Sequence, residues 1–173
     1  MNKQNIKQHL RRTFSALAIA GALLSLPSAE AGRPITARGS WTGCQNITDV
    51  QPGDLYTIIT WSVTIDFIGT FTGSYEGTEQ DVVYTDGYFT AISSDGIFTG
   101  SVSGRSGAVV MTYEAAGSPP GHIISPWIVN EGTGDLAGLH GQGTWPHVIE
   151  HGATNGCDDT FSGDYTGQIQ FAQ

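Results

Sequence analysis

Apolar and polar residues alternate along most of this chain, with the two-residue period of a β-strand. In residues 56–68 the large apolar side chains occupy every second position, at Trp61, Val63, Ile65 and Phe67. Alternate side chains of a strand point to the same face, so this segment is expected to bury one face. After the first 31 residues, no stretch of useful length has helical periodicity. The pattern therefore predicts an all-β protein.

Further strands are predicted between segments that contain turn residues. They lie near Phe71–Gly77, Tyr88–Ile92, Ile97–Ser103, Ala108–Glu114, His122–Val129, Leu136–Thr144 and Phe161–Phe171. The turn signals are Asp86-Gly87, Asp95-Gly96, Gly104-Arg105-Ser106-Gly107, Ser118-Pro119-Pro120-Gly121 and Asn155-Gly156. Short connections without crossover helices favour an antiparallel sheet. A sheet of about eight strands avoids open edges by closing, so we expect a single closed antiparallel β-barrel.

One short pattern occurs three times, at residues 71–77, 98–104 and 161–167. It consists of Phe, a hydroxyl residue, Gly, any residue, Tyr or Val, any residue and Gly. The Phe, both glycines and the Tyr or Val share one face of a strand. Large rings beside bare glycines suit a tightly curved barrel, because a ring of one strand can lie over a glycine of its neighbour.

Residues 1–31 have the composition of an export signal. Basic residues precede an apolar run at 15–27, and Ala29-Glu30-Ala31 fits the small-x-small rule of signal peptidase. We therefore expect cleavage after Ala31, one barrel domain over residues 32–173, and a secreted or periplasmic protein. The Arg11-Arg12 pair leaves both the twin-arginine and the general secretory route open. No later segment is long enough to be a membrane anchor.

The expected mature chain is strongly acidic. Residues 32–173 contain three arginines, no lysine and 15 acidic side chains, so their formal charge is 3 − 15 = −12. Such a surface repels phosphate backbones and anionic membranes, which makes nucleic acid a poor partner.

Two cysteines remain after the expected cleavage, Cys44 and Cys157. In an oxidising compartment, a pair near opposite ends of one domain indicates a disulfide. Two free thiols, or a thiol that binds a metal, are the alternatives.

Three segments resemble a known family: Gly104 to Val110, which begins Gly-Arg-Ser-Gly, Trp127, and the glycine-rich residues 132–143. They resemble an uncharacterised bacterial domain-of-unknown-function family with an allene oxide cyclase-like β-barrel. The resemblance covers roughly residues 60–171 and extends more distantly to plant allene oxide cyclases and dirigent proteins. It implies a barrel but no catalytic motif, because fold does not determine function. The export signal, the cysteine pair and an insertion-like stretch at 146–159 depart from the simpler members.

Two motifs that suggest chemistry lack the required context. Gly132-x-Gly134-x-x-Ala137 resembles a dinucleotide fingerprint, but the residues that follow continue a strand-like pattern instead of a helix. His147-Val148-Ile149-Glu150-His151 matches a zinc-protease pattern, yet Pro146 and Gly152 bracket too few residues for the helix that this pattern needs. We therefore expect neither a bound nucleotide nor a protease.

A looser metal site stays open as an alternative to a solvated polar loop. Its candidate ligands are His147, Glu150 and His151, which lie near Asp158 and Asp159 in the sequence. The acidic pair by itself lacks the alternating oxygen donors of a calcium loop. No cofactor is expected.

Candidate site residues are those whose chemistry suits a barrel lumen or its rim. Arg105 can hold a carboxylate ligand or simply belong to a turn, and Trp127 is a second candidate for ligand binding. Polar residues within apolar strands are weak catalytic candidates, because a buried acid can act as a general acid or base. They are Asp66, Glu114, His122 and His140, each of which can instead point outward.

Three hypotheses for the function follow from a small barrel of this kind. The first is a protein that binds one small, mostly apolar molecule in its lumen. The second is an isomerase or cyclase without a cofactor, which would act by positioning a flexible substrate. The third is a barrel whose lumen is filled by Phe71, Phe98, Phe161 and their neighbours, and which serves a structural or interaction role. The ligand, the oligomeric state and the question of enzymatic activity stay open at this point.

Overall fold

A computed structural model describes residues 32–118, 123, 125–154 and 156–172, with the backbone alone for 147–154. The predicted export signal lies outside the described residues. The strands are β1 (Ile35–Pro52), β2 (Tyr56–Gly69), β3 (Phe71–Tyr84), β4 (Phe89–Val102), β5 (Arg105–Gly117), β6 (Pro126–Gly134), β7 (Leu139–Thr144), β8 (His147–Thr154) and β9 (Cys157–Phe171). Within this described part, no helix is long and apolar enough to cross a membrane.

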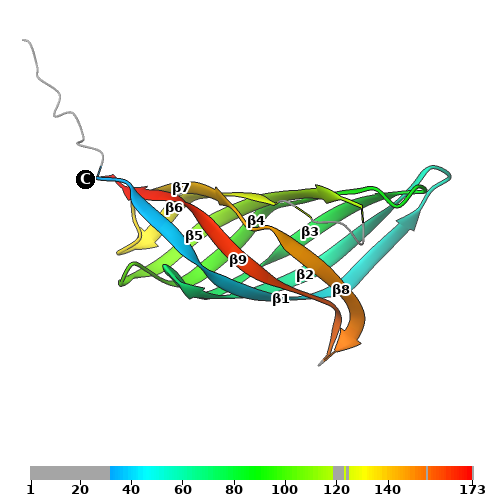
Figure 1. Cartoon of the computed structure of the whole chain (residues 1–173), viewed down its shortest axis with the longest axis horizontal. Helices are drawn as coiled ribbons and strands as arrows, with labels where there is room; N and C mark the ends of the chain where they lie inside the picture. The colour runs from blue at the N-terminus through cyan, green and yellow to red at the C-terminus, as the bar shows by residue number, and fades with distance from the viewer. Residues whose placement is uncertain (1–31, 119–122, 124, 155, 173) are drawn as a thin grey trace, which may run out of the picture.

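The strands form one antiparallel sheet that closes on itself. Each of β1 to β6 pairs with the next strand in the sequence, and β6 pairs with β7. β7 and then β8 pair with successive parts of β9, and β9 pairs with β1. Figure 1 shows the long curved strands around a common axis. The predicted all-β, closed antiparallel barrel is confirmed.

The two ends of the barrel differ. The chain from Gly32 onward starts at the end that also holds the β2–β3, β4–β5 and β6–β7 turns, which we call the terminal end. The β1–β2, β3–β4 and β8–β9 turns lie at the opposite, distal end (Figure 1).

Three features differ from the predicted strand pattern. β1 was not predicted, because glycines and polar residues interrupt its alternation, although it buries Ala37, Trp41 and Gln45. The stretch at 146–159, interpreted from the sequence as a polar loop, contains β8, which gains its backbone partners from β9. The expected turn at Asp95-Gly96 is an irregularity in the pairing of one continuous strand, β4. Long-range pairing overrides the local turn signal there.

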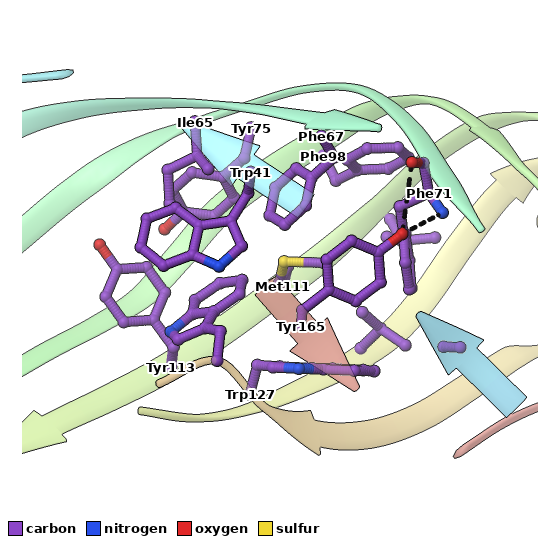
Figure 2. Close-up of a cluster of buried hydrophobic side chains, with 14 of the residues drawn as sticks. Trp41, Ile65, Phe67, Phe71, Tyr75, Phe98, Met111, Tyr113, Trp127 and Tyr165 are labelled. Carbon is purple, nitrogen blue, oxygen red and sulfur yellow. Dashed lines mark hydrogen bonds between the residues drawn. The ribbon is translucent and has the colours of Figure 1, made fainter. Parts of the chain in front are cut away.

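Aromatic side chains fill the lumen toward the terminal end. The rings in this main cluster come from Trp41, Trp61, Phe67, Phe71, Tyr75, Phe98, Tyr113, Trp127, Trp145, Phe161, Tyr165 and Phe171. The Tyr165 hydroxyl accepts a hydrogen bond from the backbone N–H of Phe71 at 2.8 Å, which links β9 to β3 (Figure 2). A second, smaller cluster near the distal end contains Phe89, Ala91, Ala115 and Ile123.

The expected stacking of rings over glycines is confirmed. A Cβ added at Gly43 would overlap the ring of Phe161, and one at Gly96 would overlap the ring of Tyr75. Glycine is needed at these positions because the ring occupies the space of a side chain. The space that a side chain would take at each of these glycines is thus filled by a ring from the adjacent strand.

The predicted disulfide is also confirmed. Cys44 in β1 and Cys157 in β9 are joined by an S–S bond of 2.05 Å, with Cα atoms 5.4 Å apart. Asp158 adds two contacts between the same strands: it accepts a hydrogen bond from the Ile47 N–H at 2.8 Å and donates its own N–H to Asn46 at 3.2 Å. The start of β9 is therefore fastened to β1 by one covalent bond and two hydrogen bonds. A disulfide is typical of an oxidising compartment.

Candidate functional site

A small cavity lies inside the barrel where the main aromatic cluster ends and the distal cluster begins. Its volume is about 20 Å³, room for about one water molecule. The residues that line it are Trp41, Gln45, Ile65, Glu79, Asp81, Phe89, Ala91, Tyr113, Ala115, Ser125, Trp145 and Phe161. Apolar walls with a few polar groups are typical of a binding site.

Strand β3 places two carboxyl groups in this cavity. Phe71 and Tyr75 are buried, and the same face continues in steps of two residues to Glu79 and Asp81. Their exposed fractions are only 7% and 8%. Trp61 of β2 pairs in register with Glu79 and donates its indole N–H to an Asp81 oxygen at 2.9 Å. The pair is thus held on the lumen side of β3.

Burial raises the pKa of both carboxyl groups. Loss of solvation and, second, the nearby negative charge of Glu79 raise the pKa of Asp81 to about 8, although the hydrogen bond from Trp61 opposes the change. Burial also raises the pKa of Glu79, which the neighbouring Tyr113 and Asp81 offset only in part. Two buried carboxyls this close resist ionising together, so near neutral pH the pair holds a proton.

Two tyrosines flank the acidic pair. The Tyr75 hydroxyl bonds to Ser93 of β4, and burial raises its pKa to about 12. The Tyr113 hydroxyl lies near Glu79, and Figure 2 shows it on the same side of the aromatic cluster as that of Tyr75. Among the described residues, neither the Tyr113 Oη nor the Asp81 Oδ1 makes a hydrogen bond of good geometry. Both atoms therefore interact with Glu79 without an ideal hydrogen bond, and a donor or acceptor of better geometry would stabilise them.

Comparison with known proteins places the chain in a family. The family model described as a protein of unknown function (DUF3224) matches residues 46–155, more than half of the chain. The chain belongs to the DUF3224 family. The prediction of an uncharacterised family is thereby confirmed, whereas the resemblance to allene oxide cyclases and dirigent proteins stays a prediction.

A solved structure from the DUF3224 family has a similar fold. It is a protein of unknown function from Shewanella oneidensis MR-1, with a TM-score of 0.61 and 15% sequence identity. The match covers 82% of this chain and 100% of that one. At this identity the likeness shows the fold alone. No curated protein matches the chain.

The catalytic candidates predicted from the DUF3224 sequence do not gather in the lumen. Asp66, Glu114 and His140 are all exposed, because each neighbours an inward residue on its strand. His122 lies outside the described residues.

The predicted ligand-binding and metal candidates lie away from the cavity or outside the described side chains. Arg105 is exposed at the β4–β5 turn, with its Cζ 4.0 Å from the centre of the Phe171 ring. Trp127 is buried in the main cluster against Phe71, with ring centres 5.7 Å apart, and does not line the cavity. The side chains of 147–151 are not described, and the other described residues form no group of three or more His, Cys, Asp or Glu able to hold a metal.

Glu79 and Asp81 of this DUF3224 protein are not among the residues predicted from the sequence. The predicted strand ends at Gly77, whereas β3 continues to Tyr84. The sequence contains the information needed to find them. Phe71 and Tyr75 show that the odd-numbered residues of this strand face inward, and both acids are at odd-numbered positions. Two acids on the inward parity of a strand are the pattern that reveals such a site.

We expect the stability of this DUF3224 protein to fall as pH rises from about 4 to about 8. The pKa of Asp81 is 3.8 as a free side chain and about 8 in the fold, so in this range the folded protein keeps a proton that the unfolded chain releases. The stabilisation from this retained proton is complete below the pKa of the unfolded chain and is lost as pH rises through the pKa of the folded protein. One such proton contributes a slope of at most about 1.4 kcal/mol per pH unit.

Denaturant unfolding across this pH range checks the expectation. Asp81→Asn should flatten the profile, since an amide oxygen can still accept the bond from Trp61 but does not titrate. An unchanged slope in the variant would assign the pH dependence to other groups.

Proposed function

We propose that this protein is an exported barrel that binds a small molecule in the cavity between its two hydrophobic clusters. The observation that carries the proposal is the pair of buried carboxyl groups, Glu79 and Asp81, in a cavity whose walls are largely apolar. Asp81 Oδ1 makes no hydrogen bond of good geometry among the described residues, so this arrangement favours a ligand that donates a hydrogen bond to it. The disulfide and the composition of residues 1–31 support export.

The packed lumen limits what can bind. Phe71, Phe98 and Trp127 are almost fully buried and fill the barrel toward the terminal end. With a cavity of about 20 Å³, a ligand must be very small or must insert only one end group. We therefore propose a ligand with a compact polar group that meets the acids and an apolar part that meets the rings.

A second candidate function is acid–base catalysis in the same cavity. The pKa of about 8 for Asp81 lies near neutral pH, where a carboxyl group can both donate and accept a proton efficiently. This observation favours an isomerase without a cofactor over a purely structural barrel. Such an enzyme must first bind its substrate, so both candidates share one test.

The indole N–H groups of the four tryptophans offer a test by NMR. Trp41 and Trp145 line the cavity and Trp61 bonds to Asp81, whereas Trp127 neither lines the cavity nor bonds to the acids and serves as an internal reference. A set of small probes (1-propanol, acetone, propionate, propionamide and propylammonium) is titrated into the protein. We expect at least one to shift the three cavity signals while Trp127 stays in place.

A matched pair of variants on β5 tests the location. Ala115 lines the cavity and its neighbour Ala116 is exposed. Ala115→Leu should abolish the probe-induced shifts because the larger side chain fills the cavity, and Ala116→Leu should leave them unchanged. Shifts that survive Ala115→Leu, or the absence of shifts with every probe, would contradict the proposal.

A further inference from the structure

We propose that the cavity is selective for a small primary ammonium group, either a simple amine or the end of a longer one. This inference rests on the proposed binding function and names its ligand class. It follows from the character of the polar atoms, the aromatic walls, the charge of the protein and the size of the space.

At the acidic pair itself, the described residues supply few hydrogen-bond donors: Trp61 donates to one Asp81 oxygen, and Tyr113 interacts with Glu79. When ionised, the Glu79 and Asp81 carboxylates only accept hydrogen bonds, and Asp81 Oδ1 has no donor among the described residues. Arg33, Arg38 and Arg105 are all exposed, and no cation contributes to the raised pKa of either acid. A ligand with several N–H donors and a positive charge would supply both the hydrogen-bond donors and the cation that the acidic pair lacks.

The walls also suit a cation. Trp145 packs against Trp41 and Tyr113, with ring centres 5.6 Å and 5.1 Å apart, and Phe161 lies 5.4 Å from Trp41. Aromatic faces attract ammonium groups through the ring quadrupole, and the attraction grows where water is excluded.

Charge and size narrow the choice further. A formal charge of −12 over residues 32–173 attracts cations and repels carboxylate or phosphate ligands. A cavity of about 20 Å³ is close to the size of one water molecule, so it can receive an –NH₃⁺ group but not a bulky quaternary one. A primary ammonium is the donor-rich cation that fits.

Binding must compete with the proton that the acidic pair holds. An ammonium group that binds the ionised pair displaces this proton to solvent, so affinity should increase as pH rises toward and through about 8. The other titratable groups that act on the pair are Tyr113 from β5 and Asp159 from β9, while Tyr75 lies beside it on β3. The two tyrosines have a raised pKa and stay neutral in this range.

The test compares probes of matched shape by the same tryptophan signals. Propylammonium, 1-propanol and propionate have similar size but carry positive, neutral and negative end groups. At constant ionic strength and a pH near 8, we expect propylammonium to bind about tenfold or more tightly than 1-propanol, and propionate not to bind. Asp81→Asn should remove this preference and the pH dependence while leaving any binding of 1-propanol in place.

Glu79→Gln provides a second variant in case Asp81→Asn does not fold, and an unchanged Trp127 signal reports that the fold is intact. Equal or tighter binding of 1-propanol overturns the ammonium inference but leaves the proposed function standing. An ammonium preference that persists in both acid variants also overturns it, because surface charge alone then explains the binding. Absence of binding by every probe overturns the proposed function itself.

Discussion

Removing the Cys44–Cys157 disulfide is expected to lower the free energy of unfolding by about 4 kcal/mol. The two cysteines are 113 residues apart, so in the unfolded chain the bond closes a loop that includes most of the domain's residues. A loop of this length restricts the unfolded chain more than a short one does. The expected loss is large compared with the stability of an ordinary domain.

The measurement is denaturant unfolding of the oxidised protein and of a Cys44→Ala/Cys157→Ala double variant, which leaves no unpaired thiol. Asp158→Ala is the matched control, because it removes the side-chain hydrogen bond from the Ile47 N–H between the same two strands but keeps the covalent link. The control should lose about 1 kcal/mol. A double variant no less stable than this control would show that the disulfide contributes little.

Gly43→Ala is expected to destabilise the barrel by about 3 kcal/mol, the upper part of the usual range for overpacking. The added methyl group would overlap the Phe161 ring, which is itself confined by Trp41 at a ring-centre distance of 5.4 Å. All three of the nearest atoms belong to that ring, so the side chain alone causes the conflict. The backbone does not need to move if the ring is removed.

This origin makes the effect testable by a double-mutant cycle. Phe161→Ala also destabilises, by leaving a hole in the aromatic cluster. In the double variant the new methyl group has room, so its loss of stability should be smaller than the sum of the two single losses. Thr42→Ala, at the exposed neighbouring position, should change stability by less than about 0.5 kcal/mol. Additive losses would refute the ring-over-glycine explanation.

The fold was predictable where local signals were strong. Alternation in residues 56–68 matched β2 closely. The repeated patterns contain Tyr75 and Phe161, whose rings lie over glycines, but the glycines that these rings cover, Gly43 and Gly96, are outside those patterns. β1 and β8 were not predicted because their residues have weak strand patterns. Both segments form strands by pairing with β9. Pairing partners are a property of the whole chain, which local periodicity does not contain.

The inward-facing acids of β3 were predictable in principle, whereas the catalytic candidates from the sequence that the structure describes lie at outward positions. Asp66 lies between Ile65 and Phe67, both buried, so the two-residue period itself directs it outward. The same reasoning excludes Glu114 and selects Glu79 and Asp81. The sequence pattern does not predict how deeply the two acids are buried, the approach of Tyr113 from β5, or the volume left between the two clusters. These features depend on the register of strand pairing in the barrel.

Closure of the ring by the first and last strands has a kinetic consequence. Ile35 pairs with Ile169, so the barrel has two open edges until its final strand is in place. Folding must therefore bring together segments more than a hundred residues apart in the sequence, which slows β-rich proteins relative to those with local contacts. During synthesis the exposed edges of β1 and of the latest strand are both available for wrong pairing. The chain should thus become resistant to aggregation only when β9 is complete and paired with β1.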